Sequence, residues 1–190
     1  MQRRSCIVAS GVAAGALALR GTAARAADKK ALALVTNGSS DFWTFARRGI
    51  EKAQNELPNY DMSIHVLAEA TAAEQRRVLD DLLTKGIAGV SVSVNDPAYE
   101  TEILNKVASQ AVLFTTDSDA ADSNRVLYIG TDNVAAGEEC GKLIKKALPD
   151  GGTIMLFVGI PGAANAQERV KGIRSSLEGT KIQILDIRSD

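Results

Sequence analysis

The chain has 190 residues, of which 45% are hydrophobic and 24% are charged, the composition of an ordinary globular domain. Its formal net charge of −1 does not indicate a surface for nucleic acids, so we expect no nucleic-acid partner. Neither Cys6 nor Cys140 has another cysteine or the single His65 at a metal-ligand spacing, which argues against a Cys/His metal site.

The first 26 residues have the layout of an export signal. Arg3 and Arg4 form a positive segment, residues 7–19 are apolar, and residues 24–26 read Ala-Arg-Ala, a typical cleavage pattern. A membrane anchor is the alternative, but the apolar stretch is shorter than the roughly 20 residues that cross a bilayer. We therefore predict a signal peptide over 1–26, of the Sec or twin-arginine type, and a mature periplasmic protein without direct membrane insertion.

Cleavage after this segment would remove Cys6 and leave Cys140 as the sole cysteine of the mature chain. Cys140 falls within residues 131–148, where apolar residues recur at helical spacing. We expect its thiol to face the buried side of that helix, as free cysteines commonly do, rather than to be a reactive group.

Strands and helices alternate along the rest of the chain. Apolar runs rich in β-branched residues predict strands, and apolar residues three and four positions apart predict helices. The first series has expected strands at 31–36, 62–68, 87–94, 111–116 and 125–130, and expected helices at 41–57, 71–86 and 96–110. The cycle then restarts, with helices at 131–148 and 163–177 and strands at 152–159 and 181–187.

This order of elements predicts a doubly wound α/β fold. Several strands are apolar at every position, which is typical of a parallel sheet covered by helices on both faces. Right-handed crossovers are expected between the parallel strands. The two series of elements meet near Gly130, so we predict two related α/β units, over 27–130 and 131–190.

Polar and aromatic side chains collect just after the expected strands. Ligands of open α/β sheets bind beyond the carboxyl ends of the strands, so these loops are the candidate site. The polar and aromatic residues of these loops are those of 37–43 after the first strand, Asn95 and Asp96 after the third, Asp117, Ser118 and Asp119 after the fourth, and Asn165 and Arg169 after the strand at 152–159. No His or mature-chain Cys accompanies them, and a Ser or Thr nucleophile would lack the base that a catalytic triad requires. We therefore expect a binding site without catalysis, cofactor or metal.

This set of side chains suits a carbohydrate. Aromatic planes can cover the apolar C–H faces of a sugar, and planar Asp, Asn and Arg groups form strong hydrogen bonds with its hydroxyls. We expect Phe42 and Trp43 to flank the ligand and Phe45, further along the helix, to lie in the core. The alternatives are that the aromatic pair only packs on the sheet, that Asp117 only stabilises a turn, and that Arg169 is solvated.

Five segments carry a resemblance to a known family. They read ALVTNGSSDFW, LLTKGIAGVSVSVNDP, FTTDSDA, YIGTDNVAAGEECGKLI and GGTIMLFVGIPGAANAQERVKGI. In this order they resemble the type I periplasmic sugar-binding proteins, the ribose-binding-protein-like solute receptors of ABC transporters. The resemblance implies a two-lobed receptor that closes on a sugar in the interlobe cleft and passes it to a membrane permease. The ligand contacts that it implies are Asn37, Ser40, Phe42, Trp43, Asp117, Asn165 and Arg169.

Two departures from the family pattern change these expectations. Ribose receptors commonly have Arg after the Asp that ends the fourth strand, whereas this chain has Ser118, which argues against ribose itself. Compared with the two full lobes that the resemblance implies, the first lobe, over 27–130, is nearly complete, and the second, over 131–190, is partial. A sheet of only two strands is marginal by itself. We therefore expect a fragment of a longer protein or a truncated, non-binding gene product, with weak or no sugar binding by residues 27–190.

Other functions predict different features. A nucleotide-dependent α/β enzyme would have a Gly-x-Gly-x-x-Gly or Walker A loop after a strand, and neither NGSSDFW nor GIPGAAN matches. A sugar-responsive repressor would have a helix-turn-helix before Lys30, where the export signal lies. A receptor that presents its sugar to a membrane sensor kinase would have the same features as a transport receptor, so it is the main alternative.

Overall fold

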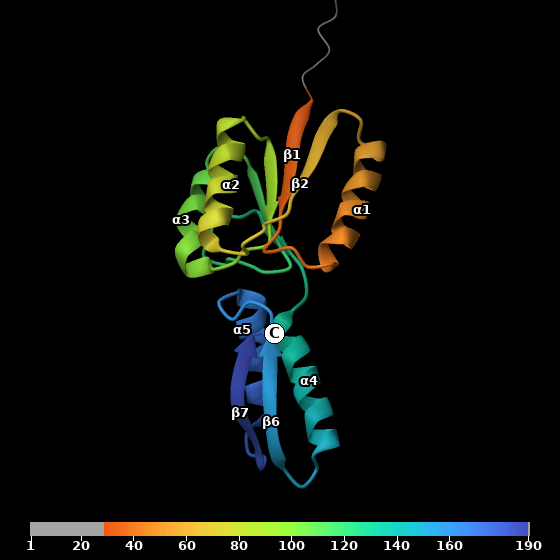
Figure 1. Cartoon of the computed structure of the whole chain (residues 1–190), viewed down its shortest axis with the longest axis vertical. Coiled ribbons are helices and arrows are strands. Elements are labelled where there is room, and N and C mark those ends of the chain that lie inside the picture. Colours follow the sequence, from red (N-terminus) through yellow and green to blue (C-terminus); the bar gives the residue numbers. More distant parts are fainter. Residues whose placement is uncertain (1–28, 190) are drawn as a thin grey trace, which may run out of the picture.

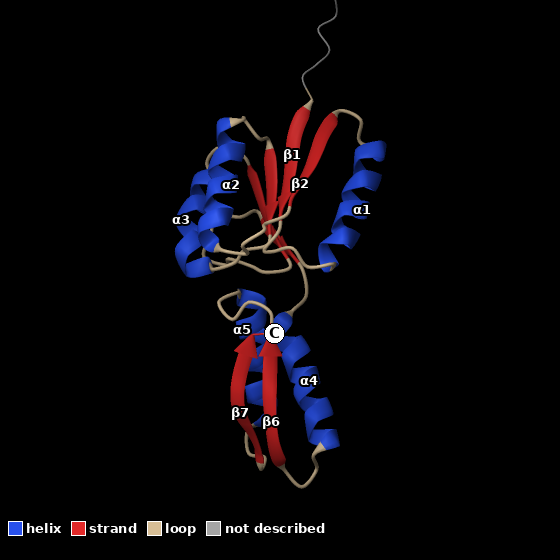
Figure 2. Cartoon of the chain, in the orientation of Figure 1, coloured by secondary structure: helices blue, strands red, loops and turns tan. Residues whose placement is uncertain are grey.

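The computed structural model describes residues 29–189, and within them the elements form two separate parallel sheets. The predicted signal peptide lies outside the described residues. We call the larger sheet with helices α1–α3 the first lobe, and the smaller sheet with α4 and α5 the second lobe (Figures 1 and 2). Each strand and helix expected from the sequence after residue 29 is present, with ends shifted by a few residues at most.

The first lobe contains parallel strands in the order β2-β1-β3-β4-β5. The strands are β1 (Lys30–Val35), β2 (Tyr60–His65), β3 (Gly89–Val92), β4 (Val112–Thr116) and β5 (Leu127–Ile129). The order reverses between β1 and β3, which is the switch point of a doubly wound sheet. The loops that follow these two strands diverge there, and ligands of such sheets bind in the resulting crevice.

The helices of the first lobe begin at signals present in the sequence. They are α1 (Phe42–Glu56), α2 (Ala72–Thr84) and α3 (Pro97–Ala108). The hydroxyl of Thr71 accepts the N–H of Glu74 at 3.2 Å at the start of α2, as the capping pattern predicts. Asp96 likewise accepts the N–H of Ala98 at 3.0 Å, with Pro97 in the first turn of α3.

The main hydrophobic core lies on one face of the first sheet. Val35, Val92 and Leu113 from the strands are buried in one cluster with Ile103 and Leu104 of α3. Helices α2 and α3 lie together on this side of the sheet, and α1 lies on the other side (Figure 1). Helices α2 and α3 therefore support the strands from one side, up to the carboxyl ends where the candidate site begins.

The opposite face of the first sheet is less covered. Leu32, Val112 and Phe114 point away from the core and line an apolar groove of about 460 Å³. Val112 is 50% exposed, because α1 packs mainly beside β2 at the far edge of the sheet. The two faces are thus covered unequally in the described residues, which differs from the expectation that helices would cover both.

The second lobe packs two helices against a two-stranded sheet. Its elements are α4 (Asn133–Ala147), β6 (Gly152–Val158), α5 (Ala164–Leu177) and β7 (Ile182–Ser189). The buried cluster of this lobe consists of Leu156, Ile173 and Leu177, with partly buried aliphatic residues around it. None of the helices between residues 29 and 189 combines the length and apolar character needed to cross a bilayer.

Glycines allow the two helices of the second lobe to approach closely. A Cβ atom at Gly137 of α4 would meet the carbonyl oxygen of Arg169 at 2.2 Å. A Cβ atom at Gly172 of α5 would meet the carbonyl oxygen of Val134 at 2.1 Å. Both distances are too short for any side chain, so these glycines fix how α5 lies against α4.

Two expectations about buried side chains are wrong. Phe45 is 76% exposed, because α1 is rotated so that Trp43 and Ile50 occupy its more buried side. Cys140 is also exposed, since the neighbouring Gly141 lies on the side of α4 that meets α5. In both helices the apolar spacing identifies the element but not the side that faces the core.

Candidate functional site

A cavity of about 730 Å³ lies between the two lobes, beyond the carboxyl ends of β1, β4 and β6. All of the candidate residues line it, namely Asn37, Ser40, Phe42, Trp43, Asp117, Asn165 and Arg169. They come from the loop after β1, the start of α1, the segment after β4, and α5. Apolar residues of β6 and its following loop, among them Leu156 and Ile160, complete the lining.

The loop after β1 forms one wall of the cavity. It turns sharply because the hydroxyl of Thr36 donates to the carbonyl oxygen of Gly38 at 2.8 Å. The carbonyl oxygen of Ser40 accepts the N–H of Trp43 at 3.1 Å, which connects the loop to the first turn of α1. Asn37 points across the sheet, and its side-chain amide donates to Asp117 Oδ2 at 3.4 Å.

The two aromatic residues at the start of α1 differ in exposure and therefore in role. Trp43 is only 5% exposed, whereas Phe42 is 56% exposed. Their rings meet edge to face, with centroids 5.1 Å apart and planes at 77°. The buried Trp43 therefore packs against the ring of Phe42, and Phe42 offers the larger exposed apolar surface to a ligand.

Asp117 has an uncommon backbone conformation. Its φ is 61°, and the N–H of Ser118 donates to the carbonyl oxygen of Thr116 at 2.7 Å, so Asp117 is the central residue of a three-residue turn. Non-glycine residues at positive φ are strained and concentrate at functional sites. The turn points the carboxylate into the interlobe cavity.

The carboxylate of Asp117 is held by donors from three elements. Oδ2 accepts the hydroxyl of Ser93 at 2.9 Å, the amide of Asn37 at 3.4 Å and the amide of Asn165 at 3.3 Å. Asn165 belongs to α5, so this last hydrogen bond crosses between the lobes. Within the described residues all three hydrogen bonds end on Oδ2, which leaves Oδ1 available to a ligand hydroxyl.

The second lobe contributes Asn165 and Arg169, which lie one turn apart on α5. The Nε of Arg169 donates to Asn133 Oδ1 at 2.9 Å. This hydrogen bond orients the guanidinium of Arg169, which is one of the residues that line the cavity. Such a fork can donate to two adjacent hydroxyls of one ligand.

Sequence reasoning missed a buried amide that supports the site. Gln75 of α2 is fully buried, and its Nε2 donates to the carbonyl oxygens of Thr36 and Ser93, both at 2.8 Å. It thereby ties together the ends of β1 and β3, from which the cavity loops depart. A signal was present, because Gln75 shares one stripe of α2 with the buried Leu79 and Leu82.

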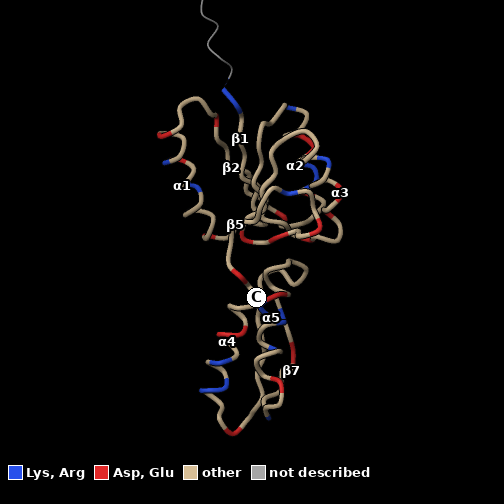
Figure 3. Tube along the Cα trace, turned by 180° about the vertical axis from the view of Figure 1, so that it is seen from behind, with Lys and Arg blue, Asp and Glu red and all other residues tan. Residues whose placement is uncertain are grey.

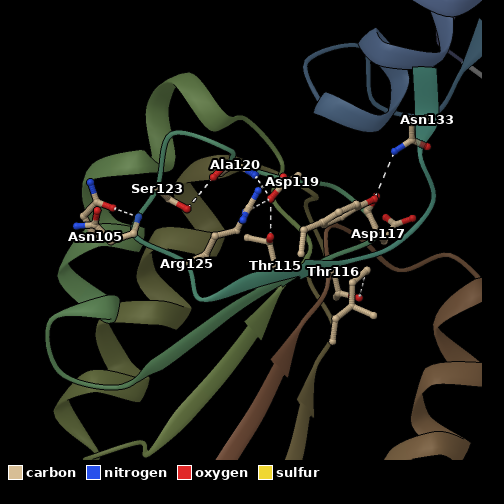
Figure 4. Close-up of polar contacts among 12 residues, drawn as sticks. Asn105, Thr115, Thr116, Asp117, Asp119, Ala120, Ser123, Arg125 and Asn133 are labelled. Carbon is tan, nitrogen blue, oxygen red and sulfur yellow. Dashed lines mark hydrogen bonds and ion pairs between the residues drawn. The ribbon is translucent and has the colours of Figure 1, made fainter. Parts of the chain in front are cut away.

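The loop after β4 contains a second acid that is not part of the cavity. Asp119 forms a two-pronged ion pair with Arg125, with N–O distances of 2.6 and 2.7 Å (Figure 4). Burial by itself would raise the pKa of Asp119, but hydrogen bonds from Arg125, Thr115 and the N–H of Ala120 lower it below its usual value. The ion pair between Asp119 and Arg125 stabilises the loop that contains Asp117.

Charge is distributed unevenly along the molecule. Acidic residues lie on the loops at the cleft-facing end of the first lobe, whereas lysines of α4 lie toward the far end of the second lobe (Figure 3). Residues 29–189 contain no group of three or more His, Cys, Asp or Glu side chains that could hold a metal ion. The residues that line the cavity offer both hydrogen-bonding groups and apolar surfaces.

Comparisons with known proteins identify a family. The model of the periplasmic binding protein domain matches residues 31–190. The chain is 27% identical over 168 residues to the ribose import binding protein RbsB of Haemophilus influenzae, a match that covers 86% of this chain and 56% of the relative. It is 28% identical over 176 residues to RbsB of Escherichia coli, covering 90% of this chain and 58% of the relative. The chain thus spans a little over half the length of these curated relatives.

Solved structures share the fold. An ABC transporter solute-binding protein from Burkholderia graminis, in complex with D-arabinose, matches with a TM-score of 0.79 and 25% identity, over 85% of this chain and 57% of that chain. A chain of the XylFII–LytSN complex matches with a TM-score of 0.75 and 25% identity, over 85% and 60% of the two chains. These matches confirm the doubly wound α/β fold expected from the sequence. The chain belongs to the periplasmic binding protein domain family.

Proposed function

We propose that the chain is the sugar-binding part of a periplasmic receptor that delivers a monosaccharide-like ligand to the permease of an ABC importer. The observation that carries this proposal is the convergence of aromatic, amide, hydroxyl, carboxylate and guanidinium groups on the interlobe cavity. A sugar requires both an apolar surface and planar hydrogen-bonding groups. The relatives named for ribose import support the same class of ligand.

Each lobe would hold a different part of the sugar. Phe42 would cover an apolar C–H face, and Asp117 would accept ring hydroxyls through the free Oδ1. Arg169 would donate its terminal N–H groups from the opposite wall, and Asn165 would exchange its hydrogen bond with Asp117 for one with the ligand. The ligand would therefore replace direct contacts between the lobes, which is how binding would favour the closed arrangement.

The ligand would be a neutral monosaccharide other than ribose. Ser118, at the position where ribose receptors commonly have Arg, is fully buried, so its hydroxyl adds no donor to the cavity. A site with one fewer charged donor discriminates differently among sugar epimers, because an unpaired hydroxyl costs binding free energy. The D-arabinose bound by the Burkholderia graminis structure makes aldopentoses the first ligands to test.

A sensing role is the second candidate. One structural match is a chain from the XylFII–LytSN complex. By that likeness, the closed receptor would present its surface to a membrane sensor kinase rather than to a permease. In either role the proposal includes export by residues 1–26 and a periplasmic receptor in which 27–130 and 131–190 contribute one wall of the site each.

The test is a titration of the ¹⁵N-labelled chain, residues 27–190, with D-arabinose, D-xylose, D-ribose and D-galactose. We expect millimolar binding, about −4 kcal/mol, because the second lobe contributes only a two-stranded sheet to the closed state. Amide shifts should concentrate at Asn37–Phe42, Asp117 and the first turn of α5. The substitution Phe42→Ala should remove these shifts, and Phe45→Ala, an exposed ring outside the cavity, should leave them unchanged.

Equal concentrations of glycerol provide the control for unspecific polyol effects. Shifts that appear equally with glycerol, or that survive Phe42→Ala, would contradict sugar binding in this cavity. The absence of shifts with every sugar would favour the truncated, non-binding product. Micromolar affinity would contradict the expectation that this chain binds weakly.

A further inference from the structure

A series of hydrogen bonds follows the chain from the first lobe into the second. The hydroxyl of Tyr128 lies 2.8 Å from the carbonyl oxygen of Asp117 and donates to it, and it also lies 3.1 Å from the carbonyl oxygen of Thr131. Asn133 Nδ2 donates to the Tyr128 hydroxyl at 3.4 Å, and Asn133 Oδ1 accepts Arg169 Nε at 2.9 Å. Figure 4 shows Asn133 reaching from the start of α4 toward the first lobe.

These contacts close into a ring. Asn165 lies one turn before Arg169 on α5, and its amide returns to the carboxylate of Asp117 at 3.3 Å. The ring therefore contains one candidate ligand group of the first lobe, Asp117, and both of those of the second lobe, Asn165 and Arg169. It encloses residues 130–132, the segment by which the described chain passes from β5 to α4.

Packing around the ring indicates that its geometry is fixed. Asn133 is 2% exposed, and both ends of its amide have partners. The Tyr128 ring lies directly on Gly130, where a Cβ atom would fall 2.1 Å from the hydroxyl oxygen. The backbone of Arg169 is fixed in turn, because its carbonyl oxygen lies against Gly137 of α4. Glycine at these two positions is what allows the ring to form.

Neither Tyr128 nor Asn133 lines the interlobe cavity. Any effect of these residues on a ligand must therefore act through Asp117 and Arg169. We propose that Tyr128 and Asn133 are positioning residues, which hold the Asp117 carboxylate and the Arg169 guanidinium in a fixed relation across the cleft and restrain the crossing segment 130–132. The inference rests on the proposed function for its ligand, but the restraint on the lobes operates without one.

The test measures the distance between the lobes by pulsed electron spin resonance. Spin labels are placed at Asn55→Cys on α1 and Lys146→Cys on α4, both exposed, in a chain with Cys6→Ser and Cys140→Ser. Tyr128→Phe removes only the hydroxyl, and Asn133→Ala removes both links. Each variant loses the hydrogen bond between Asn133 and Tyr128, which joins the lobes. We therefore expect each to raise the population of conformers with splayed lobes about fivefold without sugar, the effect of losing one ordinary hydrogen bond. Tyr99→Phe, exposed and outside the ring, is the matched control and should change nothing.

Melting temperature is measured on the same proteins. A lower melting temperature with an unchanged distance distribution in both ring variants would mean local stability only and would overturn the proposal. Tyr128→Phe keeps the aromatic ring, so it remains informative if Asn133→Ala does not fold. A wider distance distribution in the ring variants, together with no sugar binding by the parent chain, would support the restraint and reject the proposed function. Failure of the restraint can therefore be distinguished from failure of the proposed function.

Discussion

At the scale of single residues, the buried carboxyl group of Glu100 makes the stability of the fold depend on pH. It is 1% exposed, and its carboxylate accepts the N–H of Asp96 at 2.7 Å. Burial raises its pKa from 4.5 to about 7, against the hydrogen bonds from backbone N–H groups that lower it. Because the folded pKa exceeds the unfolded one, the folded chain binds the proton more tightly, and the free energy of unfolding falls as pH rises through this window.

The substitution Glu100→Gln should remove this dependence. Relative to the parent chain, the variant should gain on the order of 3 kcal/mol in unfolding free energy between about pH 4.5 and pH 7, with no further gain at higher pH. Urea unfolding across this range measures the difference. Glu102→Gln, on the same helix but exposed, is the control and should follow the parent chain. Parallel pH profiles for Glu100→Gln and the parent would disprove the assignment.

Sequence reasoning succeeded for residues whose place follows from the end of a strand. Asp117 and Asn37 could be predicted to converge because parallel strands bring their carboxyl ends to one edge of the sheet. The hydrogen-bond partners of Gln75, Tyr128 and Asn133 could not be predicted in the same way, because they depend on how the helices and loops pack in three dimensions. The ligand contacts themselves stay predictions.

At the scale of elements, the close contact between α4 and α5 is the feature that should tolerate substitution least. Gly172 and Gly137 place the backbones of the two helices in direct contact. Gly49 of α1 differs, since a Cβ atom there would meet nothing within 4 Å. The same substitution should therefore have opposite effects at the two kinds of site.

The substitution Gly172→Ala should lower the free energy of unfolding by about 2 kcal/mol or more, because the added methyl group would force α5 away from α4. Gly49→Ala should raise it by about 0.5–1 kcal/mol through helix propensity. Chemical denaturation of both variants measures the pair. Equal changes in the free energy of unfolding at the two positions would mean that α4 and α5 can separate without loss of stability.

The helices and strands themselves were largely predictable. Continuous apolar runs and spacings of three and four residues identified them, and capping residues such as Thr71 identified where helices begin. The rotation of each helix was harder, as the exposed Phe45 and Cys140 demonstrate. Apolar spacing in these helices is broad, so several orientations satisfy it, and tertiary packing selects among them.

At the scale of the whole molecule, the two lobes are unequal. The first lobe has a five-stranded sheet and an extended buried cluster, whereas the buried cluster of the second lobe consists of Leu156, Ile173 and Leu177. Two-stranded sheets gain little stability from their own pairing. The restart of the strand–helix order near Gly130 predicted two units, and the small number of strands after it predicted that the second sheet would be marginal.

Hydrogen exchange should therefore be faster in the second lobe. We expect amides of β6 and β7 to exchange at least about tenfold faster than those of β1 and β3. Ile173→Ala should accelerate exchange in the second lobe alone, and Leu104→Ala, the matched core truncation, in the first. Mass spectrometry of peptides from each lobe provides the measurement, and identical protection in both lobes would show that they unfold as one unit.

The single passage of the described chain between the lobes, at residues 130–132, has a mechanical consequence. In a variant without the Tyr128–Asn133 hydrogen bond, one such passage would allow torsion about its own axis as well as bending, so the lobes would have two soft degrees of freedom. A ligand that closes such a joint must arrest both, and the entropy lost in stopping the torsion weakens binding. Under that torsion, side chains far from residues 130–132 would move the most. Ligand groups close to this segment, such as Asp117, would therefore keep their alignment best.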